Sequence, residues 1–210
     1  TQVKKVKLVE TRQRILEIAI AQFARFGVRT ITMEDLARQA GISKKTIYQH
    51  FSDKDEIVFQ VAIHQLEEDK CEFQNMNDAS KNVVEKMVKT IEMLKKSFCE
   101  INPTMLYDIK KYHPRAWNLF IEHKQNFILT QMIKDLEKGI ADGLFRPEIK
   151  VEIIAKIHLE SIFIAFDMQV FPPDRFSFIE VQIALIDHFI RGVLSDEGLK
   201  LYKNYLNLLS

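Results

Sequence analysis

Apolar residues recur at intervals of three and four along most of the 210-residue chain. An α-helix makes one turn every 3.6 residues, so this spacing places the apolar side chains on one helical face. Six glycines and five prolines are also too few for the many turns of an all-β protein of this length. The sequence therefore predicts an all-α fold.

The first two predicted helices have clear ends. Apolar residues form one stripe over about 10–26, and Gly27 follows as a stop signal. The second helix covers about 33–39. Thr32 is its expected N-cap, and Asp35 stands three residues later as a variant of the capping box.

A tight turn at Gly41 leads into a third predicted helix, which Ser43 can cap. Ile47 and Phe51 lie four residues apart and form its inner face. The outward positions are polar, basic and aromatic: Lys44, Lys45, Thr46, Tyr48, Gln49 and His50.

The rest of the chain predicts longer helices. A fourth helix spans about 54–75, and residues 75–80 are expected to form a hinge. Prolines and glycines separate the further helices, which are expected near 81–100, 103–111, 115–142, 149–170, 175–194 and 197–208.

The charge is distributed unevenly along the chain, although the net charge is only +1. Residues 1–54 hold eleven Lys and Arg against five Asp and Glu, which gives +6, whereas residues 55–210 carry −5. Such an asymmetry is expected when one end of a protein contacts a polyanion.

Two short helices joined by a glycine turn match the geometry that places a recognition helix in the major groove of DNA. Lys44 and Lys45 are candidates for base or phosphate contacts, and Gln49 could pair with adenine. Lys54 lies at the N-terminus of the fourth predicted helix, where a positive charge and free backbone N–H groups together suit a phosphate oxygen. The alternative is that these charges form only a solvated face. The candidate DNA-binding residues are Thr32, Ser43, Lys44, Lys45, Thr46, Tyr48, Gln49, His50 and Lys54.

The basic residues near the start of the sequence could add an arm along the DNA duplex, or could serve solubility alone. They are Lys4, Lys5, Lys7, Arg12 and Arg14.

Residues 32–37, 40–51 and Lys54 resemble the TetR (tetracycline-repressor-like) family of transcriptional regulators, a match that covers about residues 10–60. The resemblance implies a three-helix DNA-binding domain over 1–54 and a helical effector-binding and dimerisation domain over 55–210, linked by the helix near 54–75. It also implies a repressor that a small molecule releases from its operator. A transcriptional activator and an architectural DNA-binding protein stay as alternatives.

Two segments, 149–171 and 176–194, are apolar on nearly all sides, so each must be covered on two faces. In the resembled family such helices pair with their copies in a second subunit, and a homodimer would read a near-palindromic operator. The expected interface residues are Ile162, Phe166, Ile179, Ile183, Ile186 and Ile190.

Aromatic, methionine and histidine residues of the middle helices are numerous enough to line a pocket for a small apolar effector. Each of them could equally be a packing residue of the core. The candidates are Phe98, Met105, Tyr107, Trp117, Phe120, His123, Phe127, His158 and Phe163.

The sequence offers no sign of catalysis. It lacks Glu-x-x-His pairs, a Gly-rich phosphate loop, HExxH and G-x-S-x-G. Neither the histidines nor Cys71 and Cys99 have metal-ligand spacing. We therefore expect no catalytic residue, no metal and no cofactor. Without an apolar run of ~18 residues, we also expect no membrane partner and a cytoplasmic location. The expected partners are double-stranded DNA, a second copy of the chain and a small apolar effector.

Overall fold

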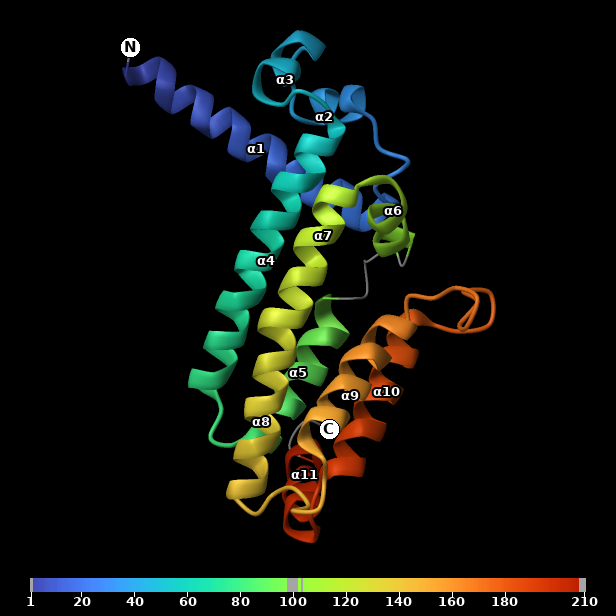
Figure 1. Cartoon of the computed structure of the whole chain (residues 1–210). Helices are drawn as coiled ribbons and strands as arrows, with labels where there is room; N and C mark the ends of the chain where they lie inside the picture. Colours follow the sequence, from blue (N-terminus) through green and yellow to red (C-terminus); the bar gives the residue numbers. More distant parts are fainter. Residues whose placement is uncertain (1, 98–101, 103, 208–210) are drawn as a thin grey trace. The chain divides into compact units, whose positions relative to one another are not determined.

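The computed structural model describes residues 2–97, 102 and 104–207, apart from the side chains of 2–9, 94, 96 and 97. Within this part the chain is helical and contains no β-strand, only an isolated bridge between Phe145 and Leu194 (Figure 1). The all-α prediction is therefore confirmed. In chain order the elements are α1 (Gln2–Phe26), α2 (Met33–Gln39), α3 (Lys44–His50), α4 (Lys54–Ala79), α5 (Val83–Ser97), α6 (Thr104–Tyr112), α7 (Pro114–His123), the π-helical turn η2 (Lys124–Ile128), α8 (Leu129–Ala141), α9 (Val151–Ile164), α10 (Phe178–Val193) and α11 (Asp196–Asn207).

The helices form two compact units. The N-terminal unit comprises Thr1–Glu68 and Glu100–Ile121, and the C-terminal unit comprises Asp69–Cys99 and Glu122–Ser210. Helices α4 and α7 each contribute residues to both units. The boundary expected at residue 54, between a DNA-binding and an effector-binding domain, stays a prediction. The two compact units are defined by packing and not by what each part binds.

The N-terminal unit has one hydrophobic core to which all of its helices contribute. The apolar faces predicted for the first three helices are buried there, and Met105 and Ile109 of α6 pack against the same core. Its fully buried members include Ile15, Ala19, Leu36, Ile47 and Ile57. The local pattern of apolar residues thus predicted the buried faces of the first three helices, whereas Met105, a pocket candidate, packs against this core instead.

Caps fix both ends of the turn between α2 and α3. The hydroxyl of Thr32 accepts from the Asp35 N–H at 3.1 Å, while the Asp35 carboxylate accepts from the Thr32 N–H at 3.0 Å. The hydroxyl of Ser43 accepts from the Thr46 N–H at 3.0 Å, and Gly41 turns the chain with a φ of +60°. The predicted capping box, glycine turn and second cap are therefore confirmed.

The predicted hinge over 75–80 is wrong, because α4 continues to Ala79. A hydrogen bond of 3.0 Å from the amide of Gln74 to the carboxylate of Asp78, one turn later, supports the polar end of the helix. The break comes instead at residues 80–82. The first helix also begins earlier than expected, at Gln2 rather than near residue 10.

The connection between α9 and α10 is longer than predicted. The apolar pattern predicts helix up to residue 170 and again from 175, whereas the structure has a loop at 165–177. The carboxylate of Asp167 accepts from the backbone N–H of Gln169 at 2.9 Å, which stabilises a turn rather than another helical residue. Pro172 and Pro173 then keep the chain from re-entering a helix.

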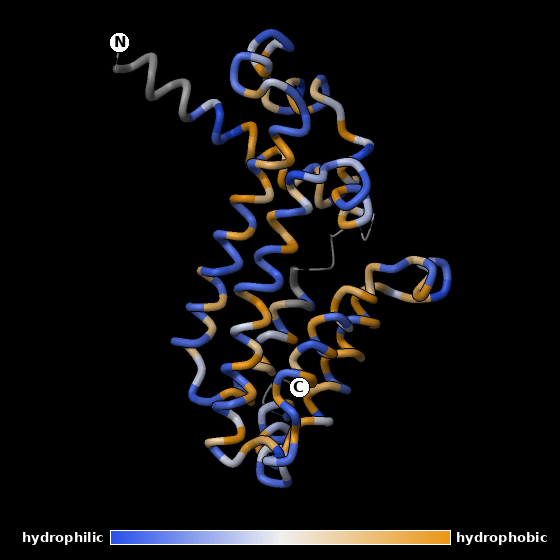
Figure 2. The backbone as a smooth tube through the Cα atoms, in the orientation of Figure 1, coloured by the Kyte–Doolittle hydropathy of each residue, from blue (hydrophilic) through white to orange (hydrophobic). Residues whose placement is uncertain are grey.

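The C-terminal unit packs α5, α8, α9, α10 and α11 around a second core. Figure 2 shows apolar residues along much of α9 and α10. Two glycines allow close approach: a Cβ on Gly139 would overlap the ring of Phe145, and one on Gly198 would overlap the carbonyl oxygen of Leu144. Helix 115–142 is nearly continuous, as predicted, but contains the π-helical turn η2.

Candidate DNA-binding surface and ligand cavity

Helix α3 presents an exposed polar face to solvent while Ile47 fixes its inner side in the core. Lys45 and Gln49 are exposed, and the side chain of Tyr48 is 45% exposed. Thr46 and His50 are half-buried at the edges of this face. These side chains belong to the outward set that the sequence analysis names.

Lys44, the first residue of α3, is held by an ion pair with Glu34 of α2. The hydrogen bond and the charge of Glu34 raise the pKa of Lys44 above its usual value. The hydroxyls of Ser43 and Thr46 lie 2.8 Å apart and bond to each other. A DNA contact by Lys44 would therefore have to compete with an acidic neighbour.

Lys54, at the start of α4, is not directed at an open helix terminus. Its ammonium donates to the carbonyl oxygen of Arg29 at 3.3 Å, and burial lowers the pKa of Lys54 below its usual value. The carboxylate of Asp53 already accepts from the Glu56 N–H at 2.8 Å. A phosphate at this terminus would find a backbone N–H in use and acidic residues beside it.

Two arginines considered for a DNA arm have structural contacts instead. The guanidinium of Arg12 lies over the ring of Phe51, 5.0 Å from its centroid, and Arg14 donates to the carbonyl oxygen of Ala40 beside the turn. Arg12 therefore contacts the residue that ends α3, and Arg14 the residue that ends α2. The side chains of Lys4, Lys5 and Lys7 lie outside the described residues.

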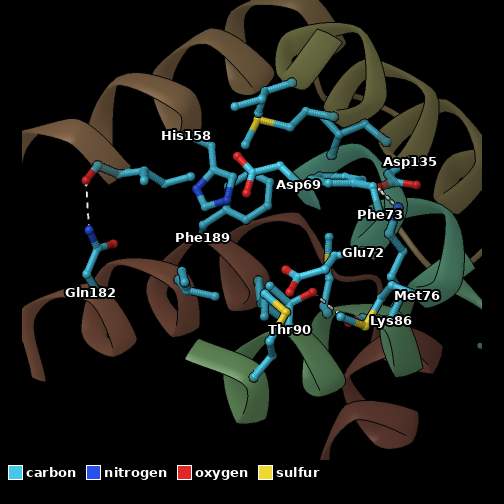
Figure 3. Close-up of a pocket in the computed structure, with 18 of the residues that line it drawn as sticks. Asp69, Glu72, Phe73, Met76, Lys86, Thr90, Asp135, His158, Gln182 and Phe189 are labelled. Atoms are coloured by element: carbon cyan, nitrogen blue, oxygen red, sulfur yellow. Dashed lines mark hydrogen bonds and ion pairs between the residues drawn. The ribbon is translucent and has the colours of Figure 1, made fainter. Parts of the chain in front are cut away.

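A cavity of about 280 Å³ lies within the C-terminal unit (Figure 3). Its wall is mainly apolar and rich in methionine, and polar groups reach it from six helices, α4, α5, α7, α8, α9 and α10. The lining residues are Asp69, Glu72, Phe73, Met76, Lys86, Met87, Thr90, Met93, His123, Ile128, Met132, Asp135, Leu136, His158, Ile162, Gln182, Ile186, Phe189 and Ile190. The volume is close to the lower end of the range for small-molecule sites.

Several polar groups of the wall have partners within it. The ammonium of Lys86 donates to the Asp135 carboxylate at 2.6 Å and lies 5.0 Å from the centroid of the Phe73 ring. Gln182, only 1% exposed, donates from its side-chain amide to the carbonyl oxygen of Ile162 at 2.9 Å. These contacts fix the shape of the wall without a ligand.

Two buried histidines differ from those groups. Nδ1 of His158 and Nε2 of His123 have no hydrogen-bond partner among the described residues. The His158 ring stacks on Phe189 with a centroid distance of 3.6 Å, and burial lowers the pKa of His158 to about 4. Burial also lowers the pKa of His123, which stacks on Phe127 at 5.0 Å. Both side chains are therefore neutral near pH 7.

The structure separates the nine residues predicted for the pocket. His123 and His158 line the cavity, and Phe127 packs edge-on against its lining residue Phe73. Phe163 belongs to α9 but is not a lining residue, and the ammonium of Lys124 lies 4.1 Å from the centroid of its ring. Four others belong to the N-terminal unit: Met105, Tyr107, Trp117 and Phe120. Phe98 lies outside the described residues.

Sequence reasoning missed the contributions of α4 and α5 to the cavity. The far half of α4 provides Phe73 and Met76, and α5 provides Met87 and Met93. Methionines at helical spacing were a usable signal, because this flexible side chain is common in adaptable binding surfaces.

The six residues predicted for the dimer interface differ in how deeply the structure buries them. Ile186 and Ile190 are buried in the core of their own unit, whereas Ile162 lines the cavity and is half-buried. Ile179 and Ile183 are half-buried, as is Phe166, whose ring packs 4.5 Å from that of Phe178. The most exposed apolar side chains of α9 are instead Ile153, Ile157 and Ile164, at 53%, 59% and 42% exposure.

No helix in the described part of the chain is both long and apolar enough to cross a membrane. No group of three or more His, Cys, Asp or Glu side chains there is arranged to hold a metal ion.

Residues 15–61 match the model of the bacterial regulatory proteins of the tetR family. This segment includes the capped helices, the Gly41 turn and the exposed face of α3. The agreement therefore concerns the same residues from which the DNA-binding surface is built.

Similarity to known proteins extends beyond this segment. The chain is 27% identical to the HTH-type transcriptional regulator YvaF of Bacillus subtilis over 178 residues, 80% of this chain and 88% of the relative. It is 25% identical to the HTH-type transcriptional repressor KstR2 of Mycobacterium tuberculosis over 149 residues, 68% and 73% of the two chains. A transcriptional regulator from Saccharomonospora viridis, solved in complex with choline, has the same fold with a TM-score of 0.69 and 18% identity, over 89% and 99% of the chains.

Proposed function

The chain belongs to the TetR family of bacterial regulatory proteins and is a DNA-binding transcriptional regulator, and we propose that it is a repressor released from its operator by a small apolar ligand. The exposed face of α3, held by two caps and the Gly41 turn, is the observation that carries this proposal. The name of the relative KstR2 supports repression rather than activation.

We assign base reading mainly to Lys45, Tyr48 and Gln49, because these side chains are exposed on α3. Lys44 joins them when DNA replaces Glu34 as its partner. Lys54 serves chiefly to tie the start of α4 to the loop at Arg29, and contributes charge rather than a direct phosphate contact. Thr32 and Ser43 act as caps that position the surface, and Thr46 and His50 lie at its edges.

We propose that the protein acts as a homodimer. One short recognition helix reads few base pairs, whereas two related by a two-fold axis read a near-palindromic site. The exposed isoleucines of α9, at positions 153, 157 and 164, follow a helical spacing and form an apolar stripe that a second copy would cover. Ile183 on α10 is half-buried and can extend the stripe.

The cavity of the C-terminal unit is the proposed effector site, because it is apolar, partly preformed and contains a few polar groups. The choline complex of the S. viridis regulator supports ligand binding in this fold. An architectural DNA-binding protein has no need of such a cavity. The proposed activity is binding rather than catalysis, and we propose the cytoplasm as its location, because the DNA target of the bacterial relatives lies there.

The test begins by selecting bound duplexes from a random-sequence pool with the purified protein. We expect a near-palindrome. On that duplex, Lys45→Ala should weaken binding by about 5- to 150-fold, since a contact to base or phosphate contributes about 1–3 kcal/mol. Lys203→Ala, which removes an exposed lysine of α11, is the matched control. Equal affinities of the two variants would remove α3 from the proposal.

The dimer has its own test by sedimentation. Ile157→Glu places a carboxylate in the apolar stripe of α9 and should yield monomers that bind the operator poorly. Tyr107→Glu makes the same kind of change on an exposed side chain of α6 and should leave the dimer intact. Dimers of undiminished affinity in the Ile157 variant would place the interface elsewhere.

A further inference from the structure

The cavity of the C-terminal unit holds two hydrogen-bonding atoms that the described protein does not use, Nδ1 of His158 and Nε2 of His123. Other polar groups of the wall are paired, as the Lys86–Asp135 ion pair and the Gln182 amide show. A buried polar atom without a partner is unfavourable, so a ligand atom that bonds to it gains affinity. The cavity therefore favours a ligand with a polar group at the histidines.

His158 is the better anchor of the two. It is 9% exposed, and its ring lies parallel to that of Phe189, with an interplanar angle of 6°. Figure 3 shows the ring extending from α9 beside Phe189 and toward the open centre of the site. The stacking fixes the direction in which Nδ1 points, so the position of its partner atom is fixed as well.

The neutral state of His158 selects the chemistry of that partner. Burial lowers the pKa of His158 to about 4, so near pH 7 one ring nitrogen is a donor and the other an acceptor. A hydroxyl group both donates and accepts and can pair with Nδ1 in either tautomer. A carbonyl group can pair only with the donor form.

The charges around the cavity argue against an acidic ligand. Asp69, Glu72 and Asp135 contribute three carboxylates, and the single lysine of the wall, Lys86, is already paired with Asp135. A ligand carboxylate would enter a site whose formal charge is negative and would face a neutral histidine. Most of the rest of the wall is formed by methionines, isoleucines, Leu136 and two phenylalanines, which suit an apolar body.

We propose that the effector is a neutral, largely apolar molecule with a hydroxyl group that hydrogen-bonds to Nδ1 of His158. This inference rests on the proposed function only in calling the molecule an effector, since binding itself requires no DNA. His123, whose Nε2 is also unpaired, provides a second polar contact for a molecule with two oxygen atoms.

Calorimetric titration of the full-length protein at pH 7 with three probes of one chain length tests the ligand class. The probes are nonan-1-ol, nonanoate and nonylammonium, which differ only in the polar group. We expect nonan-1-ol to bind most tightly, with nonanoate at least tenfold weaker. Tighter binding of nonanoate would overturn the proposal, as would tighter binding of nonylammonium, which would mean that the carboxylates select the ligand. Absence of nonan-1-ol binding up to its solubility would overturn it too.

A variant pair tests the assigned contact. His158→Phe keeps an aromatic ring against Phe189 but removes Nδ1, and should weaken nonan-1-ol binding about tenfold. His188→Phe changes an exposed histidine of α10 outside the cavity lining and should leave affinity unchanged. Equal affinities in the two variants would remove His158 as the anchor. Should His158→Phe fail to fold, the ranking of the probes on the unaltered protein decides the ligand class.

Binding and regulation can fail separately. If nonan-1-ol binds through His158 but leaves the operator complex intact, the ligand chemistry holds and the proposed release mechanism is wrong. If no probe binds while operator DNA does, the repressor assignment stands and the inference about the cavity falls.

Discussion

Replacing His158 by phenylalanine should change how the stability of the protein depends on pH. Burial lowers the pKa of His158 to about 4, against about 6.5 in an unfolded chain. As the pH falls through 6.5 the unfolded chain takes up a proton that the folded protein does not, so the unfolded state is favoured and stability is lost. The loss stops near pH 4, where the folded protein also takes up the proton.

A difference of about 2.5 pKa units corresponds to roughly 3 kcal/mol between pH 7 and pH 4. Urea unfolding followed by circular dichroism, at one protein concentration and several pH values, measures it. His158→Phe should lose about 3 kcal/mol less than the unaltered protein over this range. His123 and the carboxyl groups titrate in both proteins, so their contributions cancel. Parallel curves for the two proteins would refute the buried, neutral state of His158.

Three further substitutions test the packing and the DNA surface. Gly198→Ala should lower the free energy of unfolding by about 1–3 kcal/mol or more, seen as a lower melting temperature, because its Cβ would overlap the Leu144 carbonyl oxygen; an unchanged melting temperature would contradict this close approach. Glu34→Gln frees the lysine that begins α3 and should strengthen DNA binding severalfold at low salt and less at high salt, whereas weaker binding would show that the ion pair positions the lysine. Asp135→Ala leaves Lys86 buried without its partner and should cost about 3–5 kcal/mol in urea unfolding, while the double variant with Lys86→Met should recover most of that loss.

The N-terminal surface was predictable because its determinants are local. Thr32 and Asp35 stand three residues apart and bond to each other, and Gly41 lies where the chain needs a positive φ. The apolar stripe of each short helix also faces the core, since a short helix in a small unit has only one face to bury. Sequence spacing therefore specified the caps, the turn and the exposed face of α3.

The cavity was less predictable because it depends on helices that are distant in the sequence. His123 and Phe73 contribute to the same wall from α7 and α4, and no local spacing indicates that meeting. Trp117 and Phe120 are aromatic, like the phenylalanines that line the cavity, yet they belong to the N-terminal unit. Aromatic content alone cannot distinguish these cases.

The interface residues show a related difficulty on a helix that is apolar on most sides. On α9, Ile157 is exposed whereas its neighbours His158 and Leu159 are buried, although a polar histidine is the less obvious residue for the core. Hydrophobicity indicates that two faces must be covered but does not say which face the same subunit covers. That choice is made by the packing of α8 and α10 against α9.

The ratio of two affinities measures whether the protein binds DNA in a sequence-specific way. Fluorescence anisotropy at near-physiological salt would compare the duplex selected from the random pool with a scrambled duplex of the same composition. We expect the selected duplex to bind at least about a thousandfold more tightly, as is typical of specific regulators. Equal affinities that fall together as salt is raised would show that the protein recognises only the phosphate backbone, and would contradict sequence-specific binding.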